Sequence, residues 1–146
     1  MDYLAAFAIS GSGMTVEKMR LDVTAMNLAN VNSSRGADGT MFQPLRVVSG
    51  VRTDPRFEAA MAAWGVQLGG AQVQQLVPTD APPRMVLEPG HPDADSRGFV
   101  SYPGINPVAE MTNLITAVRT YEANVVALNA AKTMAQRALD IGGGGR

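Results

Sequence analysis

The chain of 146 residues has no cysteine, a single histidine and few aromatic residues, which make up 5% of the sequence. The absence of cysteine excludes a disulfide framework, a thiolate metal site and a cysteine nucleophile. Neither charge dominates, because 12 basic residues stand against 13 acidic ones, and no general attraction to nucleic acid or to an anionic membrane is expected. The low aromatic content is more typical of packed helix seams than of a large aromatic core.

Candidate catalytic and metal-binding residues are sparse. His91 lies in a proline-rich loop beside Asp93 and Asp95, but one imidazole without a second nitrogen or thiolate ligand makes a weak site, and a turn explains His-Pro-Asp equally well. Gly11 and Gly13 lack the preceding strand and the lysine of a phosphate loop. No serine has a positioned base and no carboxylates form a pair. We therefore predict no catalytic residue, no cofactor and no metal, and a protein that is not an enzyme.

The longest uninterrupted stretch runs from Pro107 to Ile141 and has no glycine or proline before Gly142. Asn106 is a plausible N-cap, and Pro107 suits the first helical position. This stretch predicts one helix of roughly 50 Å, which is longer than a domain of this mass is wide. We expect the helix to project from a small body or to lie in an assembly.

The apolar residues of this helix recur in alternating steps of three and four, the spacing of a coiled-coil seam. Beyond position 128 the seam gives way to a face of alanines, which lets neighbouring helices approach closely. The seam comprises Met111, Leu114, Val118, Tyr121, Val125 and Leu128, and the alanine face comprises Ala131, Ala135 and Ala138, with Leu139 beside it.

A second helix is predicted near the amino terminus, from about Tyr3 to Val31, with a seam of the same spacing. Gly11 and Gly13 interrupt it, and each glycine costs about 1 kcal/mol relative to alanine in a helix interior. We therefore expect the front end of this helix to be weak. The glycines form either a flexible hinge before Met14 or a tightly packed contact where only glycine fits. The seam comprises Ile9, Val16, Met19, Val23 and Met26.

The region between these helices has the composition of short strands and turns. Its four predicted strands would be marginal in water without a cover, and the terminal helices are the natural one. Residues 53–64 fit a short helix or a connection. The predicted strands are 41–51, 65–77, 84–87 and 98–102. The fold class expected is mainly α with a small β insertion: paired terminal helices at 1–32 and 107–141, an antiparallel β element at 33–106 and a disordered tail at 142–146.

The two helices have more apolar surface than a single antiparallel pair can bury, so part of that surface is expected to meet other chains. The asparagines on them face solvent or hydrogen-bond between helices, and both alternatives stay open. The predicted assembly interface comprises Val16, Met19, Val23, Met26, Asn27, Asn30, Met111, Leu114, Val118, Tyr121, Asn124, Val125, Leu128 and Leu139.

The amino terminus lacks the features of a secretory leader. Asp2 stands where basic residues would be expected, and the apolar run from Leu4 to Ile9 is too short for a signal-peptide core or a membrane span. We expect export, if it occurs, to proceed without a cleaved signal peptide, and we expect no direct membrane span.

Three segments resemble one protein family. NLANVNSSRG (27–36) is similar to the end of the amino-terminal helix of flagellar axial proteins, and the helix at 110–142, with its Arg-Thr-Tyr-Glu-Ala-Asn run from Arg119 to Asn124, resembles their carboxy-terminal helix. The middle stretch DAPPRMVLEPGHPDADSRGFVSYPGIN (80–106) resembles the Asp-Pro-x-His-Pro-x-Ala block of C-type proximal rod proteins of the flagellar basal body. The resemblance spans nearly the whole chain.

This resemblance implies a structural subunit of the proximal rod. Members of the family are exported unfolded through the flagellar type III export apparatus, and they assemble in the periplasm with copies of themselves and with other rod proteins. Their rod joins the membrane ring to the hook, and their terminal helices line an inner tube that transmits torque. The alternative function from another class is a cytoplasmic helical adaptor or secretion chaperone, which would use the same seams to bind partner helices.

Overall fold

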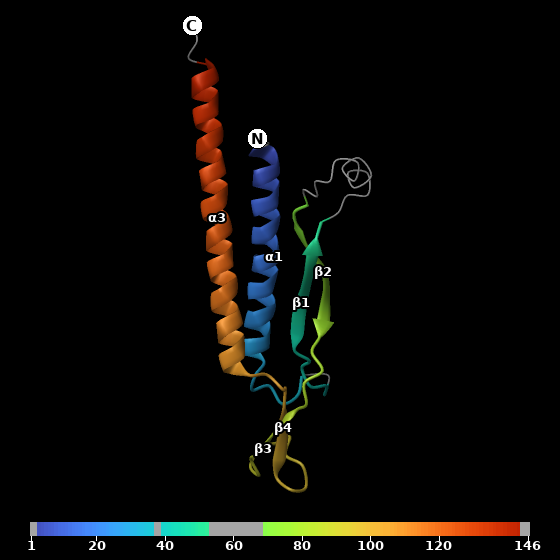
Figure 1. Ribbon diagram of the computed structural model, residues 1–146. Coiled ribbons are helices and arrows are strands. Elements are labelled where there is room, and N and C mark those ends of the chain that lie inside the picture. The colour runs from blue at the N-terminus through green and yellow to red at the C-terminus, as the bar shows by residue number, and fades with distance from the viewer. Residues whose placement is uncertain (1–2, 37–38, 53–68, 144–146) are drawn as a thin grey trace. The chain divides into compact units, whose positions relative to one another are not determined.

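The computed structural model describes residues 3–36, 39–52 and 69–143. In chain order it contains α1 (Tyr3–Ala29), β1 (Leu45–Val51), β2 (Ala71–Pro78), β3 (Arg84–Leu87), β4 (Phe99–Tyr102) and α3 (Pro107–Gly143) (Figure 1). Two long helices with short strands between them confirm the predicted fold class. Residues 53–64, for which a helix or a connection was predicted, lie outside the described residues.

The chain divides into two compact units, each of which takes part of both helices and part of the strands. The first unit consists of 1–19, 49–74 and 117–146, and the second consists of 20–48 and 75–116. The predicted division into a helical domain and a separate β element stays a prediction.

Helix α1 is continuous through both glycines, so it has no break at the predicted weak front end. A methyl group at Gly13 would lie 2.9 Å from Oδ1 of Asn124 on α3, whereas a methyl group at Gly11 would meet nothing within 4 Å. Gly13 is therefore a close-packing position, while Gly11 has room for a larger residue. The helix ends at Ala29, two residues before the predicted end, and the Asn30 side-chain amide donates to the carbonyl of Met26 at 2.9 Å.

Helix α3 begins where the sequence predicts. Oδ1 of Asn106 accepts hydrogen bonds from the backbone N–H groups of Val108 and Ala109 at 3.0 and 3.2 Å, which confirms the N-cap. The predicted end at Ile141 is wrong by two residues, because Gly142 and Gly143 continue the helix. Extending an existing helix requires no new nucleation, so two glycines at its end do not stop it.

The four strands form two ribbons of two strands each. The strands β1 and β2 run in opposite directions (Figure 1), and β3 pairs antiparallel with β4, with Val86 opposite Val100 and Leu87 opposite Phe99. Strand β1 starts four residues later than predicted, directly after Pro44, because proline has no N–H group for the ladder. Of the strand predicted at 65–77, residues 65–68 lie outside the described residues; β2 starts at Ala71, directly after two glycines.

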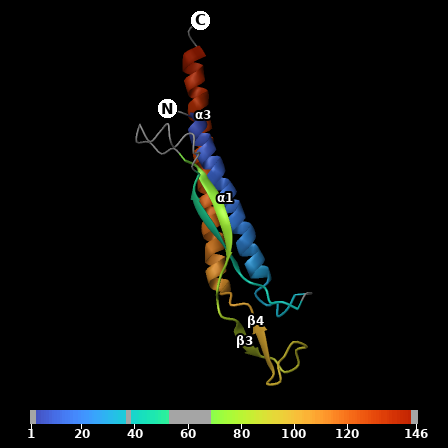
Figure 2. The same ribbon diagram turned by 90° about the vertical axis from the view of Figure 1, so that its right-hand side faces the viewer.

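In the first unit, α1 lies beside α3 with the opposite chain direction (Figures 1 and 2). The apolar side chains buried there are small or medium-sized: Val16 is 3% exposed, Ala117 3% and Ala131 4%. The hydroxyl of Ser12 accepts from the backbone N–H of Ala71 at 2.9 Å, which fastens α1 to the start of β2. Of the predicted alanine face of α3, Ala131 is buried, Ala135 is half-buried and Ala138 is exposed.

In the second unit, the core is formed by the end of α1, the start of β1 and strand β4. Val100 is fully buried at 0% exposure and Tyr102 is 7% exposed. Val23, Val47 and Ile105 are also buried there, as are Pro44 and Pro103. This core positions the polar contacts and exposed faces described next.

Candidate assembly surfaces

Asn27 is the most connected polar side chain of the second unit and is 3% exposed. Its amide nitrogen donates to the carbonyl of Leu45 at 2.9 Å and to Oε2 of Glu110 at 3.2 Å. Its amide oxygen accepts from the N–H of Leu45 at 3.0 Å. One side chain therefore joins the end of α1 to β1 and to the first turn of α3. This is the inter-element hydrogen bonding that was one of the two alternatives for the asparagines.

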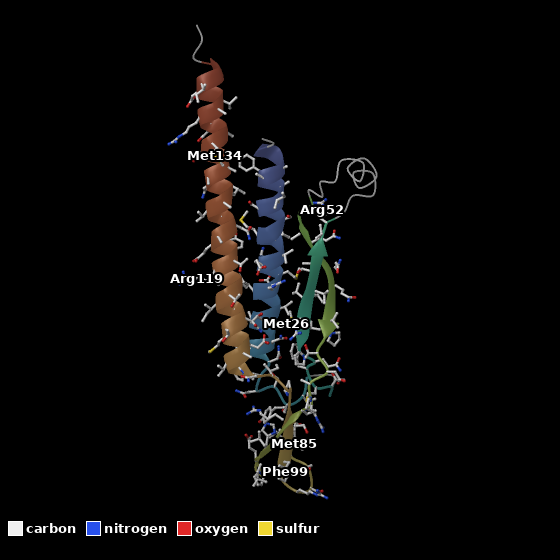
Figure 3. The ribbon with its side chains drawn as sticks, in the orientation of Figure 1. Met26, Arg52, Met85, Phe99, Arg119 and Met134 are labelled. Atoms are coloured by element: carbon white, nitrogen blue, oxygen red, sulfur yellow. The ribbon has the colours of Figure 1, made fainter. Side chains whose placement is uncertain are left out.

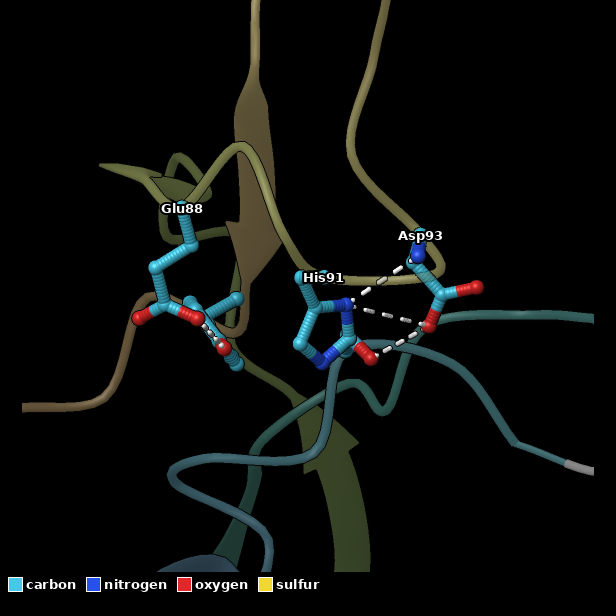
Figure 4. A network of polar contacts seen from close by, with 5 residues as sticks. Glu88, His91 and Asp93 are labelled. Atoms are coloured by element: carbon cyan, nitrogen blue, oxygen red, sulfur yellow. Dashed lines mark hydrogen bonds and ion pairs between the residues drawn. The ribbon is translucent and has the colours of Figure 1, made fainter.

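The β3–β4 ribbon is tied to the loop after α1 by two side-chain pairs. The guanidinium of Arg84 donates to Oδ1 of Asn32 at 3.1 Å. The hydroxyl of Ser34 donates to Oδ2 of Asp93 at 2.6 Å (Figure 4). These contacts join the segment that follows α1 to the β3–β4 ribbon within the second unit.

His91 organises the loop between β3 and β4. The backbone N–H of Asp93 donates to Nδ1 of His91 at 3.1 Å (Figure 4). The rings of His91 and Tyr102 pack edge to face, with their centres 6.4 Å apart. A hydrogen bond of this kind within the loop is the turn role that the sequence offered as the alternative to a ligand. Among the residues that the structure describes, no group of three or more metal-ligating side chains comes together.

Tyr102, the last residue of β4, is linked to the end of β3 through its hydroxyl. Its hydroxyl donates to Oε2 of Glu88 at 3.0 Å. Burial raises the pKa of Tyr102 above its ordinary value, and the hydrogen bond to the carboxylate raises it further. The guanidinium of Arg84, 5.3 Å from the ring centre, opposes these effects. The hydroxyl therefore stays protonated as a structural donor.

The two faces of the β3–β4 ribbon differ sharply in exposure. Val100 and Tyr102 point into the core, and the alternation of strand side chains places their neighbours on the opposite face. Those neighbours are the polar Ser101 and three apolar residues: Met85 at 52% exposure, Leu87 at 60% and Phe99 at 37%. Figure 3 shows Met85 and Phe99 on the ribbon. We call the three apolar residues the ribbon face, and it is largely uncovered.

A surface cavity of about 350 Å³ adjoins the ribbon face. Met85 and Phe99 line both the cavity and the ribbon face. Its charged lining residues are Asp93, Asp95 and Arg35, so its walls carry one more negative than positive charge. The cavity thus combines an apolar wall with a weakly acidic one.

The predicted assembly residues separate by exposure into two sets. Some already lie against their own chain: Val16, Val23 and Asn27 are buried, and Asn30, Leu114, Val118, Asn124, Val125 and Leu128 are half-buried. The others remain exposed: Met19 at 36%, Met26 at 47%, Met111 at 54%, Tyr121 at 37% and Leu139 at 75%. Whether either set contacts another chain stays a prediction.

Sequence reasoning missed several exposed apolar residues. On α3, Val108 is 72% exposed, Ile115 60% and Val126 67%, and they share a side of the helix because they recur at positions close to multiples of the helical turn. Met134 is also exposed on α3 (Figure 3). The signal was present as a second apolar periodicity, but the stronger seam hid it. In the described part of the chain, neither long helix has an apolar stretch of the kind that crosses a membrane.

Comparison with known proteins connects this geometry to a family. Residues 96–141 match the family model described as the C-terminal region of flagellar basal body rod FlgEFG proteins. The chain is 39% identical over 142 residues to the flagellar basal-body rod protein FlgC of Escherichia coli O157:H7, covering 97% of this chain and 99% of that protein. It is 37% identical to FlgC of Yersinia enterocolitica, again covering 97% of this chain and 99% of that protein. It is 32% identical to FlgC of Bacillus subtilis, covering 92% of this chain and 94% of the relative. The chain therefore belongs to the FlgC family of flagellar basal-body rod proteins.

Proposed function

We propose that this structural rod subunit polymerises through the exposed apolar side chains of its two terminal helices. The observation that carries the proposal is the exposure of large apolar residues on helices that also have a covered seam. Met26 at 47%, Met111 at 54% and Leu139 at 75% exposure leave apolar area in water that a neighbouring subunit would cover. Each such contact pairs unlike surfaces, and a contact of this kind that does not close builds a helical tube.

The mechanical part of the proposal depends on how closely the helices pack. The contact of Gly13 with Asn124 and the burial of Ala117 and Ala131 bring the two helices near each other. Interiors packed at this density resist deformation. A tube of such helix pairs would transmit torque through side-chain packing alone, and the proposal assigns no catalytic step to the chain.

The cellular setting completes the proposal. The chain works in the flagellar basal body, in contact with other rod proteins and with copies of itself. We infer that it lies in the periplasmic part of the rod, meets the membrane ring and is delivered by the flagellar type III export apparatus. The resemblance of nearly the whole chain to rod proteins supports this inference.

A complementation experiment tests the proposal. In flagellated cells that lack this gene, the natural chain should restore rods and swimming. Leu139→Asp places a charge among the exposed apolar residues of α3 and should abolish both, while the chain is still exported. Asn129→Asp adds the same charge at an exposed polar position of the same helix and should leave swimming intact. Normal swimming with Leu139→Asp would contradict assembly through the exposed apolar residues, and failure of the natural chain to restore rods would contradict the function itself.

A further inference from the structure

We propose that the ribbon face of one subunit docks on the first turns of α3 of a second copy, at a stripe formed by Val108, Met111 and Ile115. We call these three residues the helix stripe. The inference rests on the proposed function, because it names one specific contact by which the subunits polymerise.

The ribbon face has the composition of a covered surface rather than of a solvated one. In an antiparallel ribbon with one face packed on the core, the other face is ordinarily polar. Here three of the four outward residues are apolar, Met85, Leu87 and Phe99, and only Ser101 is polar, while the core side is already filled by Val100 at 0% exposure. A short two-stranded ribbon is marginal in water without a cover on its apolar surface. A partner on the ribbon face would supply that cover.

The helix stripe matches the ribbon face in extent and character. Its members are spaced by three and four residues, so they stand in line on one side of α3, and they are 72%, 54% and 60% exposed. Eight helical residues span roughly 10 Å. The ribbon face spans two residues along β3, roughly 7 Å, and one inter-strand step of about 5 Å across to β4. Each surface can therefore cover the other without leaving apolar overhang.

Charge complementarity favours this pairing over other apolar surfaces of the chain. The helix stripe continues to Arg119, one turn beyond Ile115, and the side chain of Arg119 is 80% exposed. Its ion pair with Glu122 has an N–O distance of 3.6 Å and is exposed, so it contributes little to holding the guanidinium in place. The cavity beside the ribbon face is lined by Asp93, Asp95 and Arg35 and so carries a net charge of −1. With the stripe on the ribbon face, Arg119 would supply the second cation that balances this wall.

The alternative occupant of the ribbon face is a second ribbon face. Such a contact pairs one surface with itself, so it closes into a dimer and stops. A ribbon face on a helix stripe leaves one unused surface on each subunit, so the contact repeats along a line. Only the second arrangement lets this contact itself build a polymer, and we therefore take its occupant to be a second copy of this chain.

Because the chain has no cysteine, engineered cysteines report this contact without background. Two forms of the chain, Leu87→Cys and Met111→Cys, are produced together in cells that lack the natural gene, and their basal bodies are treated with a mild oxidant. We expect a mixed disulfide-linked dimer that neither form gives alone, and a ladder of larger products when both substitutions stand in one chain. Asn113→Cys, which is exposed on the opposite side of the same turn, replaces Met111→Cys as the matched control and should give no dimer.

The outcomes distinguish this inference from the proposed function. Swimming cells without the mixed dimer would overturn the inference and leave the rod function intact. A dimer from Leu87→Cys alone would show that two ribbon faces contact each other. A photoactivatable amino acid at position 87 that labels a different protein would show another occupant. Either result overturns the inference. Charge exchange gives a second measurement: Leu87→Lys and Met111→Glu should each reduce swimming strongly, and together they should restore part of it. No restoration, alongside folded single variants, would also count against the contact.

Discussion

Replacement of Asn27 by alanine should weaken the second unit more than any other single polar substitution on α1. The side chain is 3% exposed and makes three hydrogen bonds, two with the backbone of Leu45 and one with the carboxylate of Glu110. Alanine removes all three and supplies no replacement. It also leaves the N–H and carbonyl groups of Leu45, which is half-buried, without the partner that they have now.

The magnitude follows from these contacts. Each hydrogen bond between neutral groups contributes about 1 kcal/mol net, and one to a charged group contributes about 1.5–3 kcal/mol. Glu110 is only half-buried, so water can replace part of what its carboxylate loses. We therefore expect a loss of about 3 kcal/mol from a stability that for a chain of this size is about 5–15 kcal/mol. With a denaturant slope of about 2 kcal/mol per molar, the midpoint in urea should fall by roughly 1.5 M.

The assay is urea unfolding of the purified chain followed by helix content, with Asn27→Asp as the matched comparison. Aspartate keeps the acceptor for the N–H of Leu45 but loses both donors, and it places a carboxylate near that of Glu110. The pKa of this new carboxyl should be raised in the folded state, so the variant should gain stability as the pH falls from 7 toward 4, relative to Asn27→Ala. A fall in the midpoint of less than about 0.3 M for Asn27→Ala, roughly a fifth of the value expected from the slope, would refute the proposed role of the amide.

Three further predictions concern local features. Gly11→Ala should raise the free energy of unfolding by about 0.5–1 kcal/mol, because alanine favours helix and no atom lies within 4 Å of the added methyl group. Gly13→Ala should raise it less, or lower it, because its methyl group would contact Asn124. Equal gains of the two variants in thermal unfolding would contradict the packing role of Gly13. Gly98 has a φ of 82°, so Gly98→Ala should cost about 1–2 kcal/mol and loosen the β3–β4 ribbon, measured by amide exchange; unchanged exchange would contradict it. Because the pKa of Tyr102 is raised in the folded state, its contribution to stability is fully present below about pH 10 and is lost as the pH rises through the folded pKa. Tyr102→Phe should remove this part of the decline of the unfolding midpoint at alkaline pH. Identical declines for the variant and the natural chain would contradict the prediction.

The helices were predictable because their signals are local. Asn106 and Pro107 mark a start that depends only on neighbouring N–H groups, and the structure places the cap there. The end was less predictable, since glycine at 142 lowers helix propensity without forbidding helix. The strands 84–87 and 99–102 were found nearly to the residue, because prolines and turn formers bound them on both sides.

The surfaces were less predictable than the elements. Spacing places Val16, Met19, Val23 and Met26 on neighbouring parts of one helix side, yet the valines are buried and the methionines are exposed. Which residues become buried depends on segments that are distant in sequence. One such segment is the start of β2, where the N–H of Ala71 donates to Ser12 on α1. Spacing carries no information about those segments. For the same reason the roles of Asn27 and Gly13 became visible only with their partners in place.

The division between covered and exposed side chains on α3 suggests why such a chain assembles at all. The residues that α3 buries within its own chain include Ala117 and Ala131, while Met111, Ile115 and Val126 stay exposed. Burial of a large aliphatic side chain contributes about 1.5–3 kcal/mol, and an alanine methyl contributes only about 0.8 kcal/mol. The exposed side chains of this helix therefore carry apolar free energy that only a contact with another subunit can supply. A helix pair that is close but weakly held alone, and strongly held once its outer face is covered, would favour the polymer over the free chain.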